Sequence, residues 1–174
     1  MKRQGLIYTL VFLAGIFLFV TWMTGGYAEG FDGNRVYKAE DFTLKDLSEK
    51  DVSLSSFKGS PVLLNFWATW CPYCRKERAH LNSIYKDYKD KGLIILSVST
   101  DRSVDKVKNF LKEIPSDFII LSDSDGSVAS SYNVRGLPSS FLINREGVIK
   151  YKFMGFRDWT DSGSRELLDK LIDN

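Results

Sequence analysis

The sequence predicts an α/β domain in which helices flank a central mixed β-sheet, with a β-hairpin added at its N-terminal end. Three observations favour this fold class. Short apolar runs typical of buried strands alternate with segments whose apolar residues recur every three or four positions. Further pairs of short runs flank turn residues, as the two strands of a hairpin do. The chain has 174 residues, 44% of them hydrophobic, which is enough for one domain with its own core.

The first 28 residues are expected to serve export rather than to join the fold. A basic start precedes an apolar run over residues 6–23, and no further charge occurs before Glu29. A helix over this run would span about 27 Å, close to the ~30 Å hydrocarbon core of a bilayer. The small residues Gly26 and Ala28 suit cleavage by a signal peptidase after Ala28. The sequence therefore predicts a signal peptide or a retained membrane anchor, and an extracytoplasmic domain in either case, because the positive flank stays in the cytoplasm.

The folded part is expected to begin with a hairpin. Residues 29–40 are polar and predict a linker, and a single domain should cover residues 41–174. Residues 42–44 and 52–54 flank a polar turn, and residues 55–59 predict one short helical turn. No repeat or internal linker divides the remainder, so we expect one domain.

The centre of the domain is expected to alternate between strands and helices. Strands are predicted at residues 62–67, 93–98 and 118–121, and helices at about 74–90, 103–114 and 128–132. Ser103 is placed to cap the second of these helices, which Pro115 ends. A second hairpin is predicted around Gly147, with strands at 140–143 and 148–153. The last helix carries Leu167, Leu168, Leu171 and Ile172.

The charge balance and the residue inventory exclude several function classes. The chain has 24 Lys and Arg against 22 Asp and Glu, and two of the positive residues lie in the basic start, so the rest is neutral. A neutral domain has no global electrostatic reason to bind nucleic acid or an anionic membrane. Membrane contact is expected only through the N-terminal segment, if that segment is retained. The single histidine, His80, excludes metal sites that need two histidines, and we expect it at a helix surface or boundary. Residues 123–126 resemble a calcium loop faintly, but a turn with a helix cap is expected there.

The chemistry is expected at the C-x-x-C motif formed by Cys71, Pro72, Tyr73 and Cys74. The motif lies where a buried strand passes into an amphipathic helix, and cysteines three apart in a first helical turn lie about 5–6 Å apart, within disulfide range. Pro72 suits the first helical position, which places Cys71 at the helix N-terminus. Free N–H groups and the positive end of the helix dipole favour a thiolate there. The next turn adds positive charge from Arg75, Lys76 and Arg78. We therefore expect Cys71 to be an accessible, activated thiol and Cys74 to be the resolving thiol.

Two other interpretations of the motif stay open at this point. A structural disulfide is compatible with an exported protein, but a bridge closing a four-residue loop stabilises the fold by only about 2 kcal/mol. A metal site would need further ligands, and the chain has no other cysteine. Redox chemistry is favoured, and no metal or cofactor is expected.

Four segments in order carry a resemblance to a known family: N-F-W-A-T-W-C-P-Y-C at 65–74, G-L-P-S at 136–139, F-L-I-N at 141–144 and G-F-R-D-W at 155–159. Together they resemble the thioredoxin-like fold, and more narrowly the exported TlpA/ResA branch of thiol–disulfide oxidoreductases. The resemblance extends from about residue 41 to the C-terminus. Tyr73 resembles the Pro-Tyr pair of glutaredoxins, but the exported N-terminus, the chain length and Trp70 argue against that branch. The Tyr and Trp residues as a group are spread over strand and helix faces and are expected in the core.

The resemblance implies a role for each residue of the site. Cys71 would attack and Cys74 would resolve, with support from the neighbours Trp70, Pro72 and Tyr73. Pro138 would be the cis-proline that faces the active site, although an ordinary X-Pro bond is cis only about 5–6% of the time. The backbone of Leu137, which precedes it, would be free to pair with an extended substrate strand.

Two polar positions distinguish this chain from thioredoxin itself. Thioredoxin has a buried aspartate where this chain has Asn65, so a proton relay through that aspartate is not available here. The exported branch is similar in having Asn there, with a glutamate three residues after the second cysteine. That glutamate is Glu77, for which the resemblance implies a role in tuning cysteine pKa or relaying protons. Without the resemblance, Glu77 would be interpreted as a solvated helix charge.

The expected activity is reduction of protein disulfides by an exported thiol–disulfide oxidoreductase. The roles known for the branch include reduction of apocytochrome c before haem attachment, with electrons arriving from a membrane thiol–disulfide relay protein. The direction stays open, because reduction potentials of such proteins span about −270 to −120 mV. The alternatives are an oxidase or isomerase of the same fold and a non-catalytic binding module with an inert disulfide. A peroxidase is less favoured, because neither cysteine lies in a distinct peroxidatic loop.

Overall fold

The structure, a computed structural model, describes residues 37–173. The expected signal peptide or anchor lies outside the described residues, as does the linker up to residue 36. Within residues 37–173, no helix is long and apolar enough to cross a membrane.

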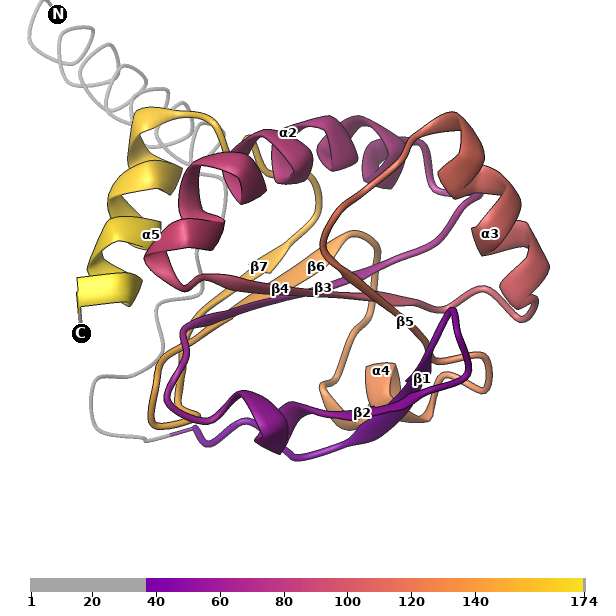
Figure 1. The fold of residues 1–174 in the computed structure, drawn as a ribbon, viewed down its shortest axis with the longest axis horizontal. Helices are drawn as coiled ribbons and strands as arrows, with labels where there is room; N and C mark the ends of the chain where they lie inside the picture. The colour runs from indigo at the N-terminus through magenta and orange to yellow at the C-terminus, as the bar shows by residue number, and fades with distance from the viewer. Residues whose placement is uncertain (1–36, 174) are drawn as a thin grey trace, which may run out of the picture.

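One mixed sheet runs through the centre of the described domain (Figure 1). Its strands are β1 (Thr43–Asp46), β2 (Asp51–Ser53), β3 (Val62–Trp67), β4 (Ile94–Ser99), β5 (Ile119–Ser122), β6 (Ser139–Ile143) and β7 (Ile149–Met154). Across the sheet they lie in the order β2-β1-β5-β4-β3-β6-β7. The three central strands β3, β4 and β5 are parallel, whereas the two flanking hairpins pair antiparallel. The predicted mixed sheet and both predicted hairpins are confirmed.

The helices form one layer on each face of the sheet. They are α2 (Pro72–Tyr88), α3 (Val104–Glu113), α4 (Ser127–Ser131) and α5 (Ser162–Asp173), with short 3-10 turns η1 (Leu54–Phe57) and η2 (Lys89–Lys91). Helices α2, α3 and α5 cover one face, while α4, η1 and the β1–β2 hairpin cover the other (Figure 1). Because the β3–β4 and β4–β5 connections step in the same direction across the sheet, right-handed crossovers place α2 and α3 on the same face.

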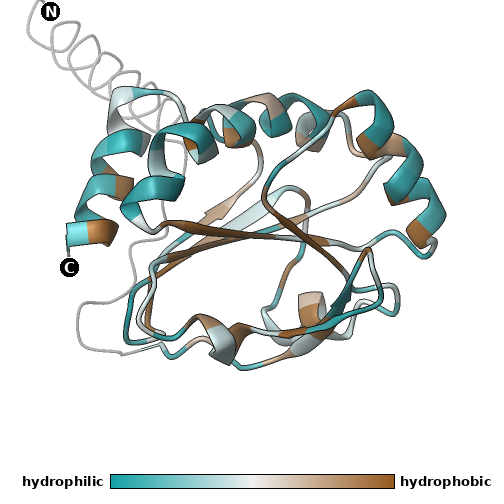
Figure 2. Cartoon of the chain, in the orientation of Figure 1, coloured by the Kyte–Doolittle hydropathy of each residue, from teal (hydrophilic) through white to brown (hydrophobic). Residues whose placement is uncertain are grey.

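Strand β3 is buried along its whole length because both layers cover it. Leu63 and Trp67 pack into the layer formed by α2, α3 and α5, whereas Leu64 and Phe66 pack into the opposite layer. Figure 2 shows the consequence, hydrophobic central strands beneath helices whose exposed sides are hydrophilic. An apolar run without alternation therefore indicated the strand correctly.

The predicted helix ends are confirmed, with two differences of detail. Helix α2 spans Pro72–Tyr88, so it begins and ends two residues earlier than the predicted segment, 74–90. Ser103 is the N-cap residue of α3, but its side chain makes no capping hydrogen bond. At α4 a more distant side chain caps the helix, because the Asp123 carboxylate accepts hydrogen bonds from the Val128 and Ala129 N–H groups at 3.2 and 2.8 Å.

The end of the expected linker is attached to the sheet. Ala39 N–H donates to the Gly147 carbonyl at 2.8 Å, and Ile149 N–H donates to the Tyr37 carbonyl at 2.8 Å. Lys38 forms an isolated bridge with Val148 between these two bonds. The chain is therefore held against the second hairpin from residue 37 onward.

Candidate active site

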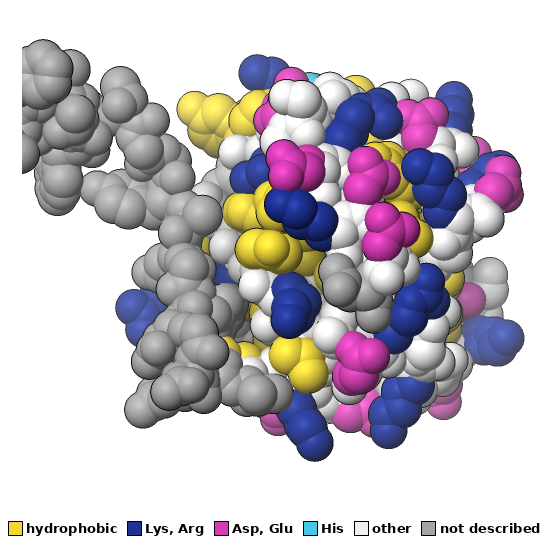
Figure 3. All heavy atoms as spheres, turned by 90° about the vertical axis from the view of Figure 1, so that its left-hand side faces the viewer, with side chains coloured by type: hydrophobic (Ala, Val, Ile, Leu, Met, Phe, Trp, Pro, Cys, Tyr) yellow, Lys and Arg dark blue, Asp and Glu magenta, His cyan; other side chains and the backbone are white. Residues whose placement is uncertain are grey.

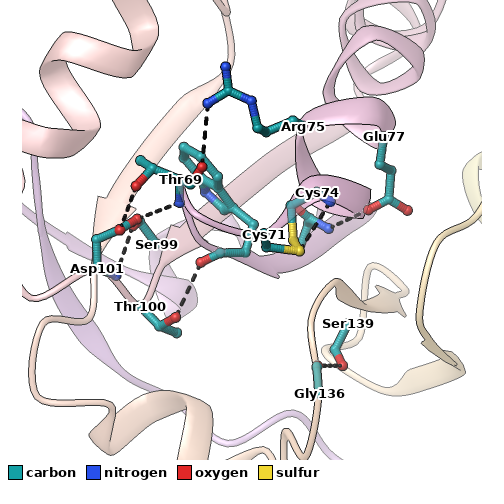
Figure 4. Close-up of a disulfide and its surroundings, with 12 residues drawn as sticks. Thr69, Cys71, Cys74, Arg75, Glu77, Ser99, Thr100, Asp101, Gly136 and Ser139 are labelled. Atoms are coloured by element: carbon teal, nitrogen blue, oxygen red, sulfur yellow. Dashed lines mark hydrogen bonds between the residues drawn. A yellow bond between two sulfur atoms is a disulfide. The ribbon is translucent and has the colours of Figure 1, made fainter.

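The C-x-x-C motif lies at one edge of the sheet, between β3 and α2. Strand β3 ends at Trp67, the four residues 68–71 follow, and Pro72 begins α2. The neighbouring parallel strand β4 ends in register with β3, since Trp67 pairs with Ser99. The residues that follow both strands therefore meet at this edge (Figure 4).

Cys71 and Cys74 form a disulfide across the first turn of α2. Their Cα atoms lie 5.3 Å apart, within the separation expected from the sequence. Cys71 is the N-cap residue, and its Sγ accepts a hydrogen bond from the Cys74 N–H at 3.2 Å. The free N–H groups of the helix terminus therefore point at the sulfur of Cys71, as the position of Pro72 predicted.

Exposure around the disulfide differs from expectation. Cys71 is 4% exposed and Cys74 is 3% exposed, so the expected greater accessibility of Cys71 is not found in the disulfide form. The aromatic neighbours Trp70 and Tyr73 are 70% and 64% exposed. They lie on the outer side of the loop and of the first helical turn, where no element of residues 37–173 covers them. The disulfide is thus a covered pair of sulfurs beside projecting aromatic side chains.

The basic residues of the first two helical turns pack against aromatic rings. Each lies 3.7 to 4.7 Å from a ring centroid: Arg75 over Phe110, Lys76 over Phe156 and Arg78 over Trp67. Arg78 is buried, and its guanidinium donates to the hydroxyl groups of Ser97 and Ser116 at 3.2 Å each. Burial lowers the pKa of Arg78 to about 9. The expected positive charge is present, but Arg78 lies inside the helix–sheet layer rather than beside solvent.

Glu77 is buried, so its interpretation as a solvated helix charge is wrong. It is 1% exposed, and its Oε1 accepts hydrogen bonds from the Trp159 indole Nε1–H at 2.8 Å and from the Arg157 backbone N–H at 3.2 Å. Its Oε2 accepts from Asn65 Nδ2 at 3.4 Å, and the same amide donates to Ser140 Oγ at 3.0 Å.

Burial raises the pKa of Glu77 to about 7, although its hydrogen-bond donors and the nearby Arg78 guanidinium oppose the rise. A carboxyl group that titrates near neutral pH therefore lies one helical turn beyond Cys74 (Figure 4).

A second contact holds the segment that covers Glu77. Asp158 lies between Arg157 and Trp159, and its Oδ1 lies 2.7 Å from Nδ1 of His80 on α2. Hydrogen bonds from Thr160 and from His80 hold the pKa of Asp158 well below its usual range. His80, expected at a helix surface or boundary, lies at the boundary and is half-buried. The sequence analysis assigned no function to residues 157–159. These residues lie about eighty positions after Glu77, and no sequence pattern predicts that they contact it.

Sequence reasoning also missed Asp101. This buried carboxylate accepts hydrogen bonds from the Thr69 N–H at 2.8 Å and from the Thr69 hydroxyl at 2.7 Å (Figure 4). The Ser99 hydroxyl donates to it at 2.8 Å. Asp101 thus fixes the loop immediately before Trp70. A signal was present in the sequence, because Asp101 follows a strand parallel to the one that leads to the cysteines, and the carboxyl ends of such strands share an edge.

The loop before β6 completes the site. The Leu137–Pro138 peptide bond is cis, as the resemblance implied. Ser139 pairs with Phe66 of β3, so Pro138 lies beside the end of β3 that leads to the cysteines. Leu137 is half-buried, and among residues 37–173 no hydrogen bond is found to either of its backbone groups. The structure therefore brings the two predicted segments, 70–77 and 137–138, to the same edge of the sheet.

Comparisons with known proteins agree with this geometry. The chain matches the AhpC/TSA family over residues 37–152. It is 34% identical to the thiol-disulfide oxidoreductase ResA of Bacillus cereus, across 98% of this chain and 99% of that protein. It is 36% identical to ResA of Bacillus subtilis, across 84% of this chain and 80% of that protein. A solved structure from Chlorobium tepidum, assigned as a thiol:disulfide interchange protein DsbE, superposes with a TM-score of 0.75 at 32% identity, covering 80% of this chain and 98% of that one.

Proposed function

Because this chain belongs to the AhpC/TSA family and is a thioredoxin-like thiol–disulfide oxidoreductase, we propose that it reduces protein disulfides outside the cytoplasm through Cys71 and Cys74. One observation carries the proposal. The disulfide lies at a helix N-terminus where the Cys74 N–H points at Cys71 Sγ, and the cis-proline loop at the same edge of the sheet carries Leu137, whose backbone groups have no hydrogen-bond partner within residues 37–173. The first feature favours a thiolate on Cys71, and the second offers a place for a substrate strand.

The reaction proceeds in two thiol–disulfide exchanges. In the reduced protein, the Cys71 thiolate attacks one sulfur of the substrate disulfide, and the other substrate sulfur leaves as a thiolate. This step produces a mixed disulfide between Cys71 and the substrate. Cys74 then attacks Cys71 Sγ as a thiolate, which releases the second substrate thiol and restores the Cys71–Cys74 disulfide. Two electrons pass to the substrate in each cycle.

Glu77 is the group we assign to the proton that Cys74 must lose. Its pKa of about 7 allows it to exchange a proton at neutral pH, and it lies on α2 three residues beyond Cys74. The indole of Trp159, the amide of Asn65 and the Arg157 N–H hold the carboxyl group in one orientation. Trp70, Pro72 and Tyr73 support the site by shaping its exposed rim and by starting the helix at Cys71.

The proposed partners are exported proteins with disulfides, of which apocytochrome c is the candidate substrate, and a membrane thiol–disulfide electron donor. The basic start and the apolar run at residues 6–23 support export. Cell fractionation followed by determination of the mature N-terminal residue tests this location. Glu29 as the first residue would establish cleavage, and an intact Met1 in the membrane would establish anchoring. A soluble full-length protein in the cytoplasm would contradict both.

Trapping of mixed disulfides in the native host tests the function. Tagged Cys74→Ser should stall at the mixed disulfide, because no resolving thiol remains. Cys71→Ser is the matched control and should trap far less, because Cys74 lacks the helix-terminal N–H groups that favour the thiolate of Cys71. After acid quenching, capture of apocytochromes and of one membrane donor would support the proposal.

Two other results would contradict the proposed reductase function and favour a different one. Capture of many newly secreted proteins, together with a reduction potential near −120 mV in glutathione buffers, would favour an oxidase or isomerase. Absence of any disulfide-linked partner, with slow reduction of the disulfide by dithiothreitol, would favour a non-catalytic module with an inert bridge.

A further inference from the structure

A hollow of about 300 Å³ lies directly beside the disulfide, between the N-terminal end of α2 and the outer side of α3. It is lined by Thr69, Trp70, Arg75, Lys106, Asn109, Phe110 and Glu113. Its volume corresponds to about ten water molecules, which is room for one or two side chains of a partner. Trp70, which immediately precedes Cys71, forms part of its wall. Any chain bound through its cysteine to Cys71 therefore passes close to this hollow.

The hollow carries an excess of positive charge. Two cationic side chains, Arg75 and Lys106, line it against one carboxylate, Glu113. Arg75 already pairs with Glu113 at 3.5 Å, and among residues 37–173 no ion pair to Lys106 is found. Near the hollow, the positive charge of exposed Arg102 is matched by the carboxylates of buried Asp101 and exposed Asp105. The excess is therefore confined to the lining itself and rests on Lys106, since Arg75 is paired with Glu113. Basic and acidic side chains are interspersed on the face of the molecule that Figure 3 shows.

The Arg75 side chain is held in place by contacts with the Trp70 loop and with α3. The buried Asp101 fixes Thr69 through the N–H and the hydroxyl group, at 2.8 and 2.7 Å. The Thr69 carbonyl in turn accepts a hydrogen bond from Arg75 Nη1 at 3.4 Å, and the guanidinium lies 4.7 Å from the centroid of the Phe110 ring. The Arg75 side chain and the Trp70 loop therefore form one arrangement before any partner binds. Pre-organised groups lose less conformational freedom on binding, which favours a specific contact.

We propose that this hollow receives an acidic segment of the redox partner, in which an Asp or Glu near the reactive cysteine pairs with Lys106 and Arg75 while the chain packs on Trp70. The inference rests on the proposed function, since it concerns the partner of that same site. Opposite charge in the partner would neutralise the excess on Lys106 and Arg75, and the 70% exposed indole of Trp70 supplies apolar contact. The partner class is thus a protein whose disulfide is flanked by acidic residues.

Two synthetic peptides test the inference. Each has a central cysteine activated as a 2-thiopyridyl disulfide, flanked on both sides by Asp and Glu in one peptide and by Asn and Gln in the other. Reduced protein attacks the cysteine sulfur and displaces thiopyridone, whose absorbance reports the second-order rate constant. Wild type should react about threefold or more faster with the acidic peptide at an ionic strength of about 0.02 M, and the ratio should approach one at about 0.5 M salt.

Charge substitutions on α3 test whether the preference for the acidic peptide arises at the hollow. Lys106→Glu should lower the acidic-to-neutral ratio by about threefold or more, since it replaces an attraction by a repulsion. Lys108→Glu is the matched control, because it makes the same change on an exposed residue about 200° away around α3 and should leave the ratio unchanged. Glu113→Gln should raise the ratio, because it frees Arg75 from its ion pair.

The possible failures are distinguishable. A wild-type ratio near one, or an equal loss in the Lys106→Glu and Lys108→Glu variants, would overturn the hollow as an acidic-segment site while leaving the reductase intact. If both peptides react no faster than they do with dithiothreitol, the proposed function itself fails. Circular dichroism of each variant confirms that the fold is retained.

Discussion

Replacing Glu77 by Gln should change how the stability of the protein depends on pH. Glu77 has its pKa raised from 4.5 to about 7, chiefly because burial disfavours the charged form. A carboxyl group with a raised pKa in the folded state binds more protons folded than unfolded between these two values. Its stabilising contribution is therefore complete below pH 4.5 and is lost as the pH rises through about 7. The shift corresponds to about 3 kcal/mol of unfolding free energy. Gln cannot ionise, yet its amide oxygen still accepts from the Trp159 indole and the Arg157 N–H.

Urea unfolding of the oxidised protein, followed by tryptophan fluorescence at pH 5, 6, 7 and 8, measures the effect. The free energy of unfolding of Glu77→Gln relative to wild type should rise by about 2–3 kcal/mol from pH 5 to pH 8. Contributions of all other titrating groups cancel in this difference. Glu146→Gln, the same substitution at an exposed carboxyl group, is the control for the chemical change itself. Parallel curves for wild type and Glu77→Gln would refute the reasoning, because they would mean that Glu77 titrates as a solvated carboxyl group.

Three further predictions follow from the site. The pKa of each cysteine can be measured in single-cysteine variants from the pH dependence of iodoacetamide labelling. The pKa of Cys71 should lie below that of a free thiol, about 8.5, and below that of Cys74. Two values near 8.5 would contradict activation of Cys71 by the helix N-terminus. Asp101→Ala should lower the free energy of unfolding by about 1–2 kcal/mol, because it leaves the half-buried Thr69 donors without their acceptor. A loss below about 0.5 kcal/mol in urea would show that the contact does not hold the loop. Asp158 has a lowered pKa, because Thr160 and His80 hydrogen-bond to its carboxylate, so its stabilising contribution is present above pH 3.8 and is lost at lower pH. Asp158→Asn should therefore flatten the acid limb of the stability curve, and an unchanged limb would argue against these contacts.

The fold was largely predictable because its signals are local. The unbroken apolar run of β3 indicated a strand covered on both faces, and that strand is buried along its length. Gly147 has a φ of +77°, a left-handed backbone that favours glycine, and it marks the turn of the second hairpin as predicted. Pro72 placed Cys71 at the helix N-terminus for the same kind of reason, since proline at the first helical position loses no hydrogen bond.

The less predictable features are those that depend on what covers a side chain. Trp70 and Tyr73 would be core residues by composition, but the loop and the first helical turn direct them to solvent. Arg78 lies at a position where a cation is usually solvated, yet it is buried against the Trp67 ring. The exposure of Trp70 and Tyr73 and the burial of Arg78 do not follow from apolar periodicity. The spacing of apolar residues predicts which side of a helix faces the sheet, but it does not predict which other side a later segment covers.

The sequence by itself determined the order of strands and helices, the C-x-x-C motif at a helix N-terminus and the spacing of its two sulfurs, because each depends on residues close together in the chain. Only the tertiary structure decided the electrostatics of the site. Glu77 becomes a buried group with a pKa of about 7 because Arg157 and Trp159, about eighty residues later, fold over it. The positive hollow beside Trp70 likewise exists because α2 and α3 lie on the same face of the sheet and bring Arg75 near Lys106. Desolvation and charge pairing depend on distance in space, and that distance is set by packing between segments far apart in the chain.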